Sequence, residues 1–518
     1  MRELVGVGGV VASLSVTSDL TRGHPPGEAM RACLLATELA RRAGLDLVRQ
    51  SEVYYGTLLR FVGCAATSHE IAAALGGDDV AVRAAGDLID PTVPGQAQQF
   101  LAGLGVSAGQ LRALGGPAGV ARLKAEGARA DCEVGAGLAG RLRLPEEVGR
   151  AILDAFERYD GHGVPGGRAG DEITLAARFA AVGFTAVMFE SVGGVKVAAQ
   201  TVAQWSGRAL DPAVTAVFLD APDELLGICD PDDLWAAAVD CEPQPRRVFR
   251  DDAALDDALA GFGDAADLKS PWFTGHSGGV ARLAMAAAAG QLDQAVAGLV
   301  YRAGLVHDIG RVAVPTGIWE RPGALRPEEW ELVRLHPYHS GRILARSPVL
   351  APLGEIACRH HERADGSGYP AGTRGSELDA AACLLAAADV FHALGEPRPH
   401  RPAVGRAEAA RVLAGLPLDR DAVRAVLAAA DVPAAALPRL PAGLTERELD
   451  VLRLLAAGHT KREIASDLVI SPSTVHTHTV HIYAKCGVST RAALAMFAMR
   501  HGLAAWADQA RSGQASRP

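Results

Sequence analysis

The sequence predicts an all-α protein, and three features of its 518 residues support this fold class. The chain is rich in Ala, Leu, Glu and Arg, which favour helices. Apolar residues recur mostly at helical spacing in the longest patterned segments. Near the C-terminus, 445–448 and 460–463 both read T-x-x-E, the capping box that opens a helix, and each precedes an apolar run.

Length and charge restrict the number of domains and the kind of partner. A chain of this length is expected to form about three domains. With 49% apolar and 21% charged residues it is typical of a globular protein, and apolar runs such as 384–390 are too short to span a membrane. We therefore expect a cytoplasmic protein with no membrane partner. The net charge of −9 argues against a globally basic nucleic-acid binder but allows a local DNA-binding module.

One segment of the chain occurs twice. ERYDGHGVPGG at 157–167 and ERADGSGYPAG at 362–372 share the pattern E-R-x-D-G-x-G-x-P-x-G. The segments that follow them, 170–189 and 375–394, also align without a gap. The chain therefore contains two copies of one helical unit, the first longer because of a Gly/Ala-rich insertion.

Changes in composition divide the chain into six parts. The predicted parts are the first copy (1–225), an acidic connector (226–268), the second copy (269–430), a Pro-rich linker (431–443), a C-terminal module (444–505) and a tail (506–518).

Histidines concentrate in short motifs of the second copy: TGHSGG, LVHDIGR, RLHPYHSG and CRHHERADG. Imidazole and carboxylate groups together suit Fe, Mn, Zn or Ni. Adjacent helical residues point about 100° apart, so His307–Asp308 and His360–His361 fit two neighbouring ions, with Asp308 bridging, better than one. Asp389 lies in an apolar run, where a metal would offset the cost of burying its charge. The alternative for each histidine is a surface or satisfied core residue.

The motifs HDIGR, HPYHSGRIL, HHERADGSGYP and AADVFHAL resemble the HD-GYP family over residues 270–405. That family consists of helical dinuclear metal phosphohydrolases that cleave cyclic dinucleotides, chiefly cyclic di-GMP. The resemblance implies HD-type helical domains, two divalent ions (Fe or Mn first) and catalytic roles for Asp308 and Arg311. The implied metal ligands are His276, His307, Asp308, His336, His360, His361 and Asp389, and the implied substrate loop contains Asp365, Gly366, Gly368, Tyr369 and Pro370.

Three positions depart from the family pattern. Arg311 replaces the usual Lys, which keeps the positive charge but changes its reach and geometry. Trp272 stands where some members have a Glu for a third metal, so two ions are expected here. His392 replaces the usual Asp, and we expect a solvated or core histidine.

In the first copy the matching positions have lost their metal ligands: they are Glu28, Arg60–Phe61, a position near Asp131, Ala155–Phe156 and Phe184. The nearby His69–Glu70 does not rebuild a site. The turn-forming residues persist, namely Asp160, Gly161, Gly163, Pro165 and Gly167. We expect a retained fold without chemistry, which serves as a packing partner or dimerisation surface or, on more assumptions, as a ligand sensor.

Residues 444–503 resemble the LuxR-type helix-turn-helix without gaps. The resemblance implies a small four-helix domain in which a helix opening at Ser471 enters the major groove of double-stranded DNA, and a homodimer. A helical bundle for protein contacts is the alternative. His476 replaces a common Lys and places a pH-sensitive group at the interface. The implied DNA-binding residues are Lys461, Ser473, Thr474, His476, Thr477 and Lys485.

Two functions follow from these resemblances. The first is a cyclic-dinucleotide phosphodiesterase fused to a DNA-binding domain, which links second-messenger turnover to transcription. The second is a transcriptional regulator whose second copy senses metal or nucleotide without hydrolysis. The complete ligand set favours the first, and Arg311 together with the fusion favours the second. Hydrolysis of another nucleotide is a third, weaker possibility.

Overall fold

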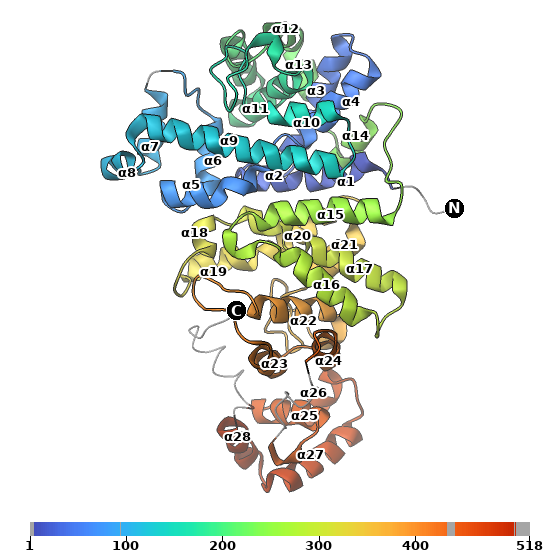
Figure 1. The fold of residues 1–518 in the computed structure, drawn as a ribbon. Coiled ribbons are helices and arrows are strands. Elements are labelled where there is room, and N and C mark those ends of the chain that lie inside the picture. The colour runs from blue at the N-terminus through green and yellow to red at the C-terminus, as the bar shows by residue number, and fades with distance from the viewer. Residues whose placement is uncertain (1–4, 94, 433–440, 502, 504–518) are drawn as a thin grey trace. The chain divides into compact units, whose positions relative to one another are not determined.

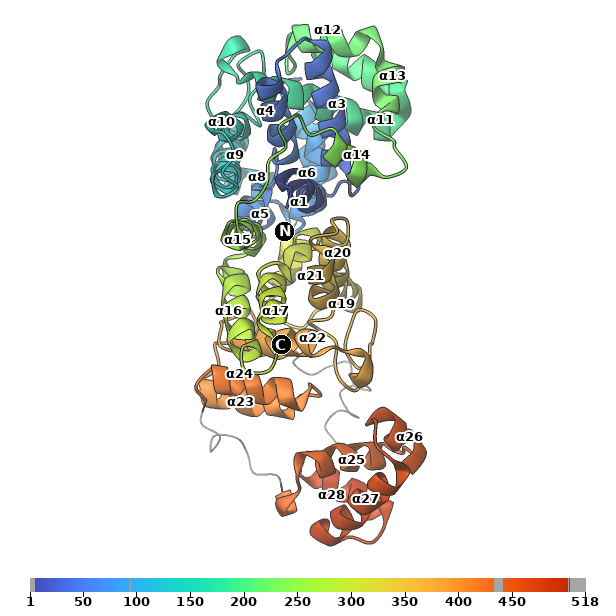
Figure 2. The ribbon, with the colours of Figure 1, turned by 90° about the vertical axis from the view of Figure 1, so that its right-hand side faces the viewer.

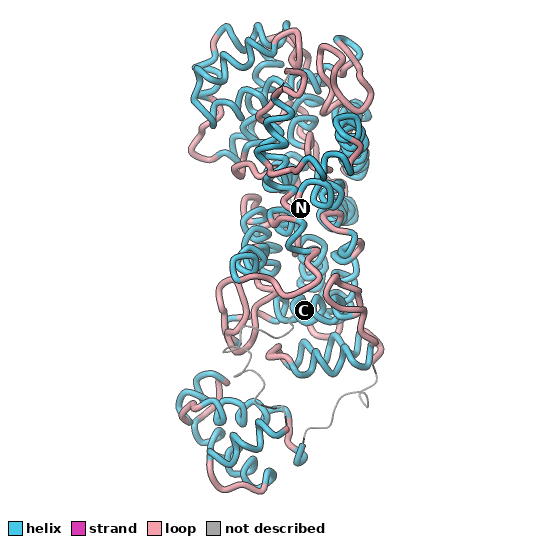
Figure 3. Tube along the Cα trace, turned by 90° about the vertical axis from the view of Figure 1, so that its left-hand side faces the viewer, coloured by secondary structure: helices cyan, strands magenta, loops and turns pink. Residues whose placement is uncertain are grey.

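The structure is a computed structural model that describes residues 5–93, 95–432, 441–501 and 503. Most of the predicted Pro-rich linker (431–443) and the whole tail (506–518) lie outside the described residues. Within the described part, every regular element is a helix, as Figure 3 shows, and β-pairing is limited to isolated bridges. The all-α prediction is confirmed.

The chain divides into two compact units. The first unit comprises Met1–Gly278, Leu305–Arg321 and Pro327–Cys358, and the second comprises Gly279–Gly304, Pro322–Arg326 and Arg359–Pro518.

Helices of the first copy and the connector belong to the first unit, and Figure 1 labels each of them. They are α1 (Val7–Leu14), α2 (Val16–Thr21), α3 (Glu28–Arg42), α4 (Leu47–Leu58), α5 (Ser68–Leu75), α6 (Asp79–Asp87), α7 (Gln96–Gly103), α8 (Ala108–Ala113), α9 (Gly116–Arg141), α10 (Glu146–Leu153), α11 (Leu175–Trp205), α12 (Pro212–Asp220), α13 (Pro222–Gly227), α14 (Leu234–Asp240) and α15 (Asp252–Asp267).

The core of the first copy forms where α11 packs on α3 and α4. Gly183 of α11 lies so close to α3 that an added Cβ would be 2.8 Å from the carbonyl oxygen of Ala32. Among the described helices, α11 alone has the length and apolarity to cross a membrane, and 61% of its most apolar stretch is buried inside the protein. Its apolar composition is thus used in the core of this unit.

The predicted acidic connector contains two packed helices. In α14, Trp235 donates through Nε1 to the carbonyl oxygen of Gly9 at 2.9 Å. α15 packs on α9 and buries Leu255, Leu259 and Phe262, which repeat at helical spacing. The connector is therefore an integral part of the first unit.

Helices of the second copy are distributed over both units. They are α16 (His276–Ala288), α17 (Gln294–Val306), α18 (Thr316–Trp319), α19 (Pro327–Arg334), α20 (His336–Leu344), α21 (Ala351–Ala357), α22 (Ala380–Leu394), α23 (Arg406–Gly415) and α24 (Arg420–Ala429). In the first unit α20 packs on α21 and on the 3-10 helix η4 (Ile309–Ala313), and in the second unit α22 packs on α23 and α24.

The C-terminal module is a bundle of four helices (Figure 2): α25 (Glu446–Ala457), α26 (Lys461–Asp467), α27 (Pro472–Cys486) and α28 (Arg491–Arg500). Both predicted capping boxes are present, with Thr445 opening α25 and Thr460 opening α26. Pro472 is the first residue of α27, where its missing N–H costs nothing. The buried core includes Leu449, Leu452, Leu455, Ile464 and Val475.

Candidate metal centre

Asp308 lies at the centre of a buried cluster in the first unit. The Nε2 atom of His307 is 2.8 Å from its carboxylate, and that of His336 is 3.1 Å away. The Nε2 atom of His276 is 3.4 Å from the same carboxylate. All four side chains are buried. The predicted ligands that belong to this unit therefore gather around one acidic group.

Arg311 brings a positive charge to the same carboxylate. Its Nη2 atom lies 2.5 Å from Oδ2 of Asp308 and 3.4 Å from Nε2 of His276. Its guanidinium also stacks on Phe273, 4.3 Å from the ring centroid. Burial alone would raise the pKa of Asp308, but Arg311 and His307 together lower that pKa well below its ordinary value. The Asp308 carboxylate is consequently ionised.

His336, the first residue of α20, is held from two sides. Its Nδ1 atom is 2.6 Å from the carbonyl oxygen of Val333, so this nitrogen carries the proton and Nε2 faces Asp308. The ring of Trp319 meets the imidazole edge to face, with centroids 5.6 Å apart. Trp319 also donates through Nε1 to the carbonyl oxygen of Arg311 at 3.4 Å. The imidazole is thus oriented by contacts outside the predicted ligand set.

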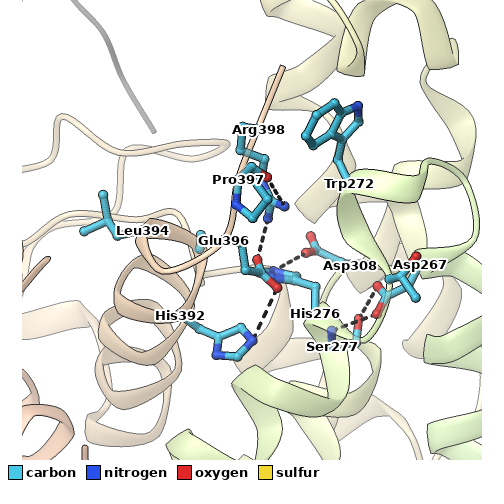
Figure 4. A network of polar contacts seen from close by, with 12 residues as sticks. Asp267, Trp272, His276, Ser277, Asp308, His392, Leu394, Glu396, Pro397 and Arg398 are labelled. Atoms are coloured by element: carbon cyan, nitrogen blue, oxygen red, sulfur yellow. Dashed lines mark hydrogen bonds and ion pairs between the residues drawn. The ribbon is translucent and has the colours of Figure 1, made fainter. Parts of the chain in front are cut away.

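His276 opens α16, and the turn before it is fixed by Asp267. The Asp267 carboxylate accepts the backbone N–H and the hydroxyl of Ser277 at 2.9 and 2.7 Å (Figure 4). Burial raises the pKa of Asp267 to about 6. Sequence reasoning assigned no role to this aspartate, whose only signal was its place at the end of the acidic stretch.

The remaining predicted ligands gather in the second unit. The rings of His360 and His361 lie 4.1 Å apart, and Nδ1 of His361 is 3.8 Å from Oδ2 of Asp389. Tyr369 of the predicted substrate loop stacks on His361 at 4.7 Å. Asp389 is buried on α22, as its apolar surroundings predicted. Each unit thus brings its own share of the predicted ligands together.

The loop that carries Tyr369 is held by Glu362. Its carboxylate accepts the backbone N–H groups of Ala371, Gly372 and Thr373 at 2.8, 3.2 and 3.0 Å. Sequence reasoning gave Glu362 no role, although its place as the first residue of the repeated pattern was an available signal. The repeated segment is therefore a turn folded around its own glutamate.

The first copy forms the same turn. The carboxylate of Glu157 accepts the backbone N–H groups of Gly166 and Arg168 at 2.6 and 3.1 Å. A Cβ added to Gly163 would lie 2.5 Å from the Cα of Glu157, and the matching Gly368 is equally crowded. The shared pattern therefore reflects one backbone conformation that needs glycine at this position.

The positions that match metal ligands are filled differently in the first copy. Phe61, Phe156 and Phe184 form an aromatic cluster, with centroids 4.9 Å apart for Phe61–Phe184 and 5.6 Å for Phe61–Phe156. The guanidinium of Arg22 lies 3.9 Å above the Phe61 ring, and its Nη1 atom is 3.1 Å from the carboxylate of Glu28. Three counterparts of the metal ligands are therefore in contact, but they are aromatic rings, and the guanidinium of Arg22 lies over one of them. We call this guanidinium the internal cation of the first copy.

His69 and Asp131 have other partners. His69 contacts Glu320 of the second copy, with Nδ1 2.8 Å from Oε1. Asp131 accepts from Arg83 at 3.1 Å and from Thr67 at 2.9 Å. Over the residues that the structure describes, no group of three metal-type side chains lies close enough to share an ion in the first copy.

His392 is half-buried and has polar neighbours. Its Nε2 atom lies 3.4 Å from Oε1 of Glu396, which accepts from Arg398 at 2.7 Å (Figure 4). A Cβ added to Gly279 would collide with the imidazole at 2.1 Å. The imidazole thus occupies space that only a glycine leaves open.

The C-terminal module exposes all of the predicted DNA-binding residues. Nζ of Lys461 lies 2.9 Å from Nδ1 of His476, which joins the start of α26 to the first turns of α27. The exposed residues of that predicted set on α27 are Ser473, Thr474, His476, Thr477 and Lys485.

Lys485 is engaged within the module. Its Nζ lies 2.6 Å from Oε2 of Glu448, the glutamate of the capping box at Thr445. Burial would raise the pKa of Glu448, but Lys485 and the Thr445 contacts lower it. This lysine therefore ties α27 to α25, which sequence reasoning did not anticipate.

Comparison with known families assigns two parts of the chain. Residues 262–417 match the HD domain family, and this range contains every predicted metal ligand and the repeated turn of the second copy. Residues 262–417 are an HD domain. Residues 442–498 match the bacterial regulatory proteins of the luxR family and form the LuxR-type module. The HD domain begins inside α15, so the end of the predicted connector belongs to it.

Relatives of this HD-domain protein include cyclic-dinucleotide phosphodiesterases. It is 27% identical over 404 residues to the 3'3'-cGAMP-specific phosphodiesterase 3 of Vibrio cholerae, a match that covers 76% of this chain and 87% of the relative. A cyclic di-GMP phosphodiesterase of Thermotoga maritima is 44% identical over 98 residues, which are 18% of this chain and 27% of the relative. A cyclic di-GMP phosphodiesterase of Pseudomonas aeruginosa is 40% identical over 145 residues, which are 27% of this chain and 35% of the relative.

A solved structure shares the fold. The crystal structure of a cyclic GMP-AMP-specific phosphodiesterase of Vibrio cholerae superposes with a TM-score of 0.58 at 23% identity. The match covers 84% of this chain and all of that one, so it extends beyond the HD domain.

The chemistry of the buried donors fits a divalent metal. In the HD domain, three imidazole Nε2 atoms lie within 3.4 Å of one ionised carboxylate. Mixed imidazole and carboxylate sets suit Fe, Mn, Zn or Ni. The bond from Nδ1 of His336 to a backbone carbonyl is the usual support of a metal-binding histidine. The HD domain therefore has the donors, the burial and the outer contacts of a metal site.

Proposed function

We propose that the HD domain is a metal-dependent phosphodiesterase that hydrolyses a cyclic dinucleotide, with cyclic di-GMP and 3'3'-cGAMP as the first candidates. The observation that carries this proposal is the buried, ionised Asp308 with three imidazoles directed at it. The names of the relatives supply the substrate class. We further propose that the LuxR-type module binds double-stranded DNA, which links turnover to transcription.

The proposed ligands are the seven residues of the sequence motifs, and two ions, Fe or Mn first, are the proposed complement. Bound there, the metal supplies a water activated for attack on phosphorus and neutralises charge on the phosphodiester. The ligands are His276, His307, Asp308, His336, His360, His361 and Asp389.

The charge at Asp308, the guanidinium of Arg311 and the Tyr369 loop have separate proposed roles. Asp308 stays ionised because Arg311 and His307 oppose the effect of burial on its pKa, so the carboxylate is available as a ligand without losing a proton first. Arg311 places a guanidinium beside the centre, where it attracts a phosphate. We propose that the loop of Asp365, Gly366, Gly368, Tyr369 and Pro370 forms the substrate entrance, with Tyr369 held by its stacking on His361.

The decisive experiment combines metal analysis with a hydrolysis assay. Purified full-length protein is expected to contain divalent metal and to hydrolyse cyclic di-GMP or 3'3'-cGAMP when Mn or Fe is supplied. His307→Ala should abolish turnover and lower the metal content. His339→Ala is the matched control, because His339 lies in the same motifs but outside the ligand set. A metal-loaded protein that hydrolyses neither nucleotide would refute the proposed activity.

A second candidate function is a non-hydrolysing sensor. The observation that favours it is Arg311, whose Nη2 already lies 2.5 Å from Oδ2 of Asp308. A sensor would bind metal or nucleotide, alter DNA binding and leave the nucleotide intact. Measurement of nucleotide binding beside hydrolysis, with DNA affinity recorded in the same samples, separates the two candidates.

Lys461 provides a test of the proposed DNA binding. Lys461 is exposed at the start of α26 next to His476, so both suit a phosphate contact. Lys461→Ala should reduce the salt dependence of DNA affinity by about one phosphate contact. Fluorescence anisotropy with a labelled double-stranded DNA across a salt series is the measurement. We also propose a homodimer in the cytoplasm, as is usual for modules of this type.

A further inference from the structure

We infer that the first copy positions the metal centre of the HD domain, and that Asp79 and His69 are the residues through which it does so. This inference rests on the proposed function and assigns a role to residues outside the HD domain. Asp79 opens α6, within the first copy's insertion around residues 70–125, and His69 lies in α5, just before that insertion. All the contacts described below lie within the first unit.

The main contact is a fully buried ion pair. Oδ2 of Asp79 accepts from Nζ of Lys269 at 2.7 Å, and neither side chain is exposed to solvent. The other oxygen, Oδ1, accepts the backbone N–H of Thr316 at 2.8 Å. Thr316 in turn donates through Oγ1 to the carbonyl oxygen of Lys269 at 3.3 Å. One carboxylate of the first copy thus binds two separate segments of the HD domain.

The backbones of the two copies touch beside this ion pair. The N–H of Gly317 donates to the carbonyl oxygen of Gly77 at 2.8 Å. A Cβ added to Gly317 would lie 2.7 Å from that oxygen and 2.8 Å from the Cα of Gly77. Only glycine at position 317 permits this approach. Its partner Gly77 has a positive φ of 96°, which also favours glycine.

A second polar contact joins the same segments. Nδ1 of His69 lies 2.8 Å from Oε1 and 2.9 Å from Oε2 of Glu320. Ser270 donates to Oε1 of Glu320 at 2.7 Å. Glu320 directly follows α18, and Ser270 directly follows Lys269. The first copy therefore holds α18 and the segment around Lys269 together at two points.

Both segments lead to the metal centre. α18 ends in Trp319, which packs on His336, lies 5.5 Å from the ring of Phe273 and donates to the carbonyl of Arg311. The segment around Lys269 runs into His276 at the start of α16. A shift of either segment would change the orientation of an imidazole directed at Asp308.

The energetics favour geometry over simple stability as the purpose of this pair. Two buried charges are costly to desolvate, and replacing such a pair by apolar groups is often neutral or stabilising. What an ion pair with extra hydrogen bonds supplies is a fixed arrangement of the backbone segments that it joins. Displacing a reactive geometry by about 1 Å can cost about a hundredfold in rate, so loss of the pair should affect turnover.

The test uses full-length variants that disturb the contact from three sides. Asp79→Asn removes the charge, Gly317→Ala forces the backbones apart, and His69→Gln alters the partly exposed second contact with little risk to folding. The controls are His162→Ala, an exposed histidine of the first copy, and Gly323→Ala, where an added Cβ meets nothing within 4 Å. The readouts are kcat, KM, bound metal per chain and hydrogen exchange of residues 305–321.

We expect Asp79→Asn and Gly317→Ala to lower kcat by about tenfold or more and His69→Gln by about threefold, while KM changes by less than about twofold. Exchange of 305–321 should accelerate and metal content fall in these variants and not in the controls. Asp79→Asn combined with Lys269→Met should regain stability, because no unpaired charge remains, but should not regain kcat, because the contact that fixes the two segments is still missing. Recovery of kcat in the double variant would count against the inference. If Asp79→Asn does not fold, His69→Gln and Gly317→Ala test the inference on their own.

Folded His69→Gln and Gly317→Ala proteins with the kcat, metal content and exchange of the wild type would overturn the inference while leaving the phosphodiesterase proposal intact. A wild-type protein that holds metal without turnover would refute the phosphodiesterase proposal instead. In that case metal retention and hydrogen exchange, which need no substrate, still judge the role of Asp79 and His69.

Discussion

The two copies form the same turn but are built around opposite charges. In the HD domain, the carboxylate of Asp308 is buried among imidazoles, with His307 2.8 Å away. In the first copy, the matching position is Phe61, and the guanidinium of Arg22 lies 3.9 Å above its ring. Arg22 also pairs with Glu28, which stands where the HD domain has its first histidine. The first copy thus contains a cation of its own where we propose that the HD domain binds metal.

This difference separates what the repeated turn does from what the centre does. Glu157 and Glu362 fold their segments in the same way, and neither contributes to the charge at the centre. The turn is therefore a property of the fold. The proposed chemistry depends on other side chains, and in the first copy three of the matching positions are the aromatic residues Phe61, Phe156 and Phe184.

The largest effect is expected where the copies differ most. Asp308→Ala should lower kcat by about a thousandfold or more, because Asp308 is a proposed ligand of the metal and the proposed metal catalysis would be worth several kcal/mol. Phe61→Leu, at the matching position, should leave kcat within about threefold of the wild type. Hydrolysis rates with metal content measure both. Equal losses for the two variants would mean that the first copy takes part in catalysis.

The internal cation of the first copy is expected to govern its stability. Arg22→Met leaves the buried Glu28 and its neighbour Asp87 without their guanidinium and should lower the free energy of unfolding by about 3–5 kcal/mol. Arg41→Met, which removes an exposed partner of Glu38, should leave stability unchanged. Urea unfolding of the full chain checks both. An Arg22→Met protein as stable as the wild type would show that the cation has no stabilising role.

The same cluster predicts a dependence of stability on pH. Burial acts to lower the pKa of His24, but hydrogen bonds to Asp87 and Glu28 outweigh it and raise the pKa to about 9. Because the folded pKa exceeds the ordinary value of 6.5, this stabilisation is complete below pH 6.5 and is lost as the pH rises to 9. Unfolding curves between pH 6 and 9.5 should therefore show a decline that is smaller in His24→Gln. An equal decline in stability in both proteins would show that His24 is not its cause.

The smallest effect is expected at the loop. Tyr369→Val introduces the residue of the first copy, Val164, and removes the stacking on His361. We expect kcat/KM to fall by about fivefold to tenfold, while Tyr369→Phe keeps the ring and nearly full activity. Steady-state kinetics on a cyclic dinucleotide provide the measurement. A Tyr369→Phe variant as weak as Tyr369→Val would show that the hydroxyl carries the role.

Local rules predicted the local structure well. The capping boxes at Thr445 and Thr460, the burial of Asp389 in its apolar run and the all-α fold follow from patterns within a few residues. The clustering of His276, His307 and His336 on Asp308 followed from motifs whose spacing the resemblance had already related to one centre.

The contacts that sequence reasoning missed join residues far apart in the chain. His69 was considered as a substitute ligand in the first copy, yet it contacts Glu320 some 251 positions away. Lys485 was assigned to DNA, yet it pairs with Glu448. Arg22 was given no role, because its stacking on Phe61 joins two turns that lie apart in the sequence. Such pairings are set by tertiary packing and leave no periodic pattern in the sequence.

The role of Asp267 limits how the segment before the HD centre can change. Asp267 is the last residue of α15, and its carboxylate holds Ser277 beside His276. Insertion of one residue into α15 would turn Asp267 by about 100° around the helix axis and remove it from Ser277. Within α15 an insertion before Asp267 cannot keep both Asp267 on Ser277 and Leu255, Leu259 and Phe262 in the core, because it turns the two groups relative to each other. We therefore expect α15 to keep its length in related proteins even where its composition changes.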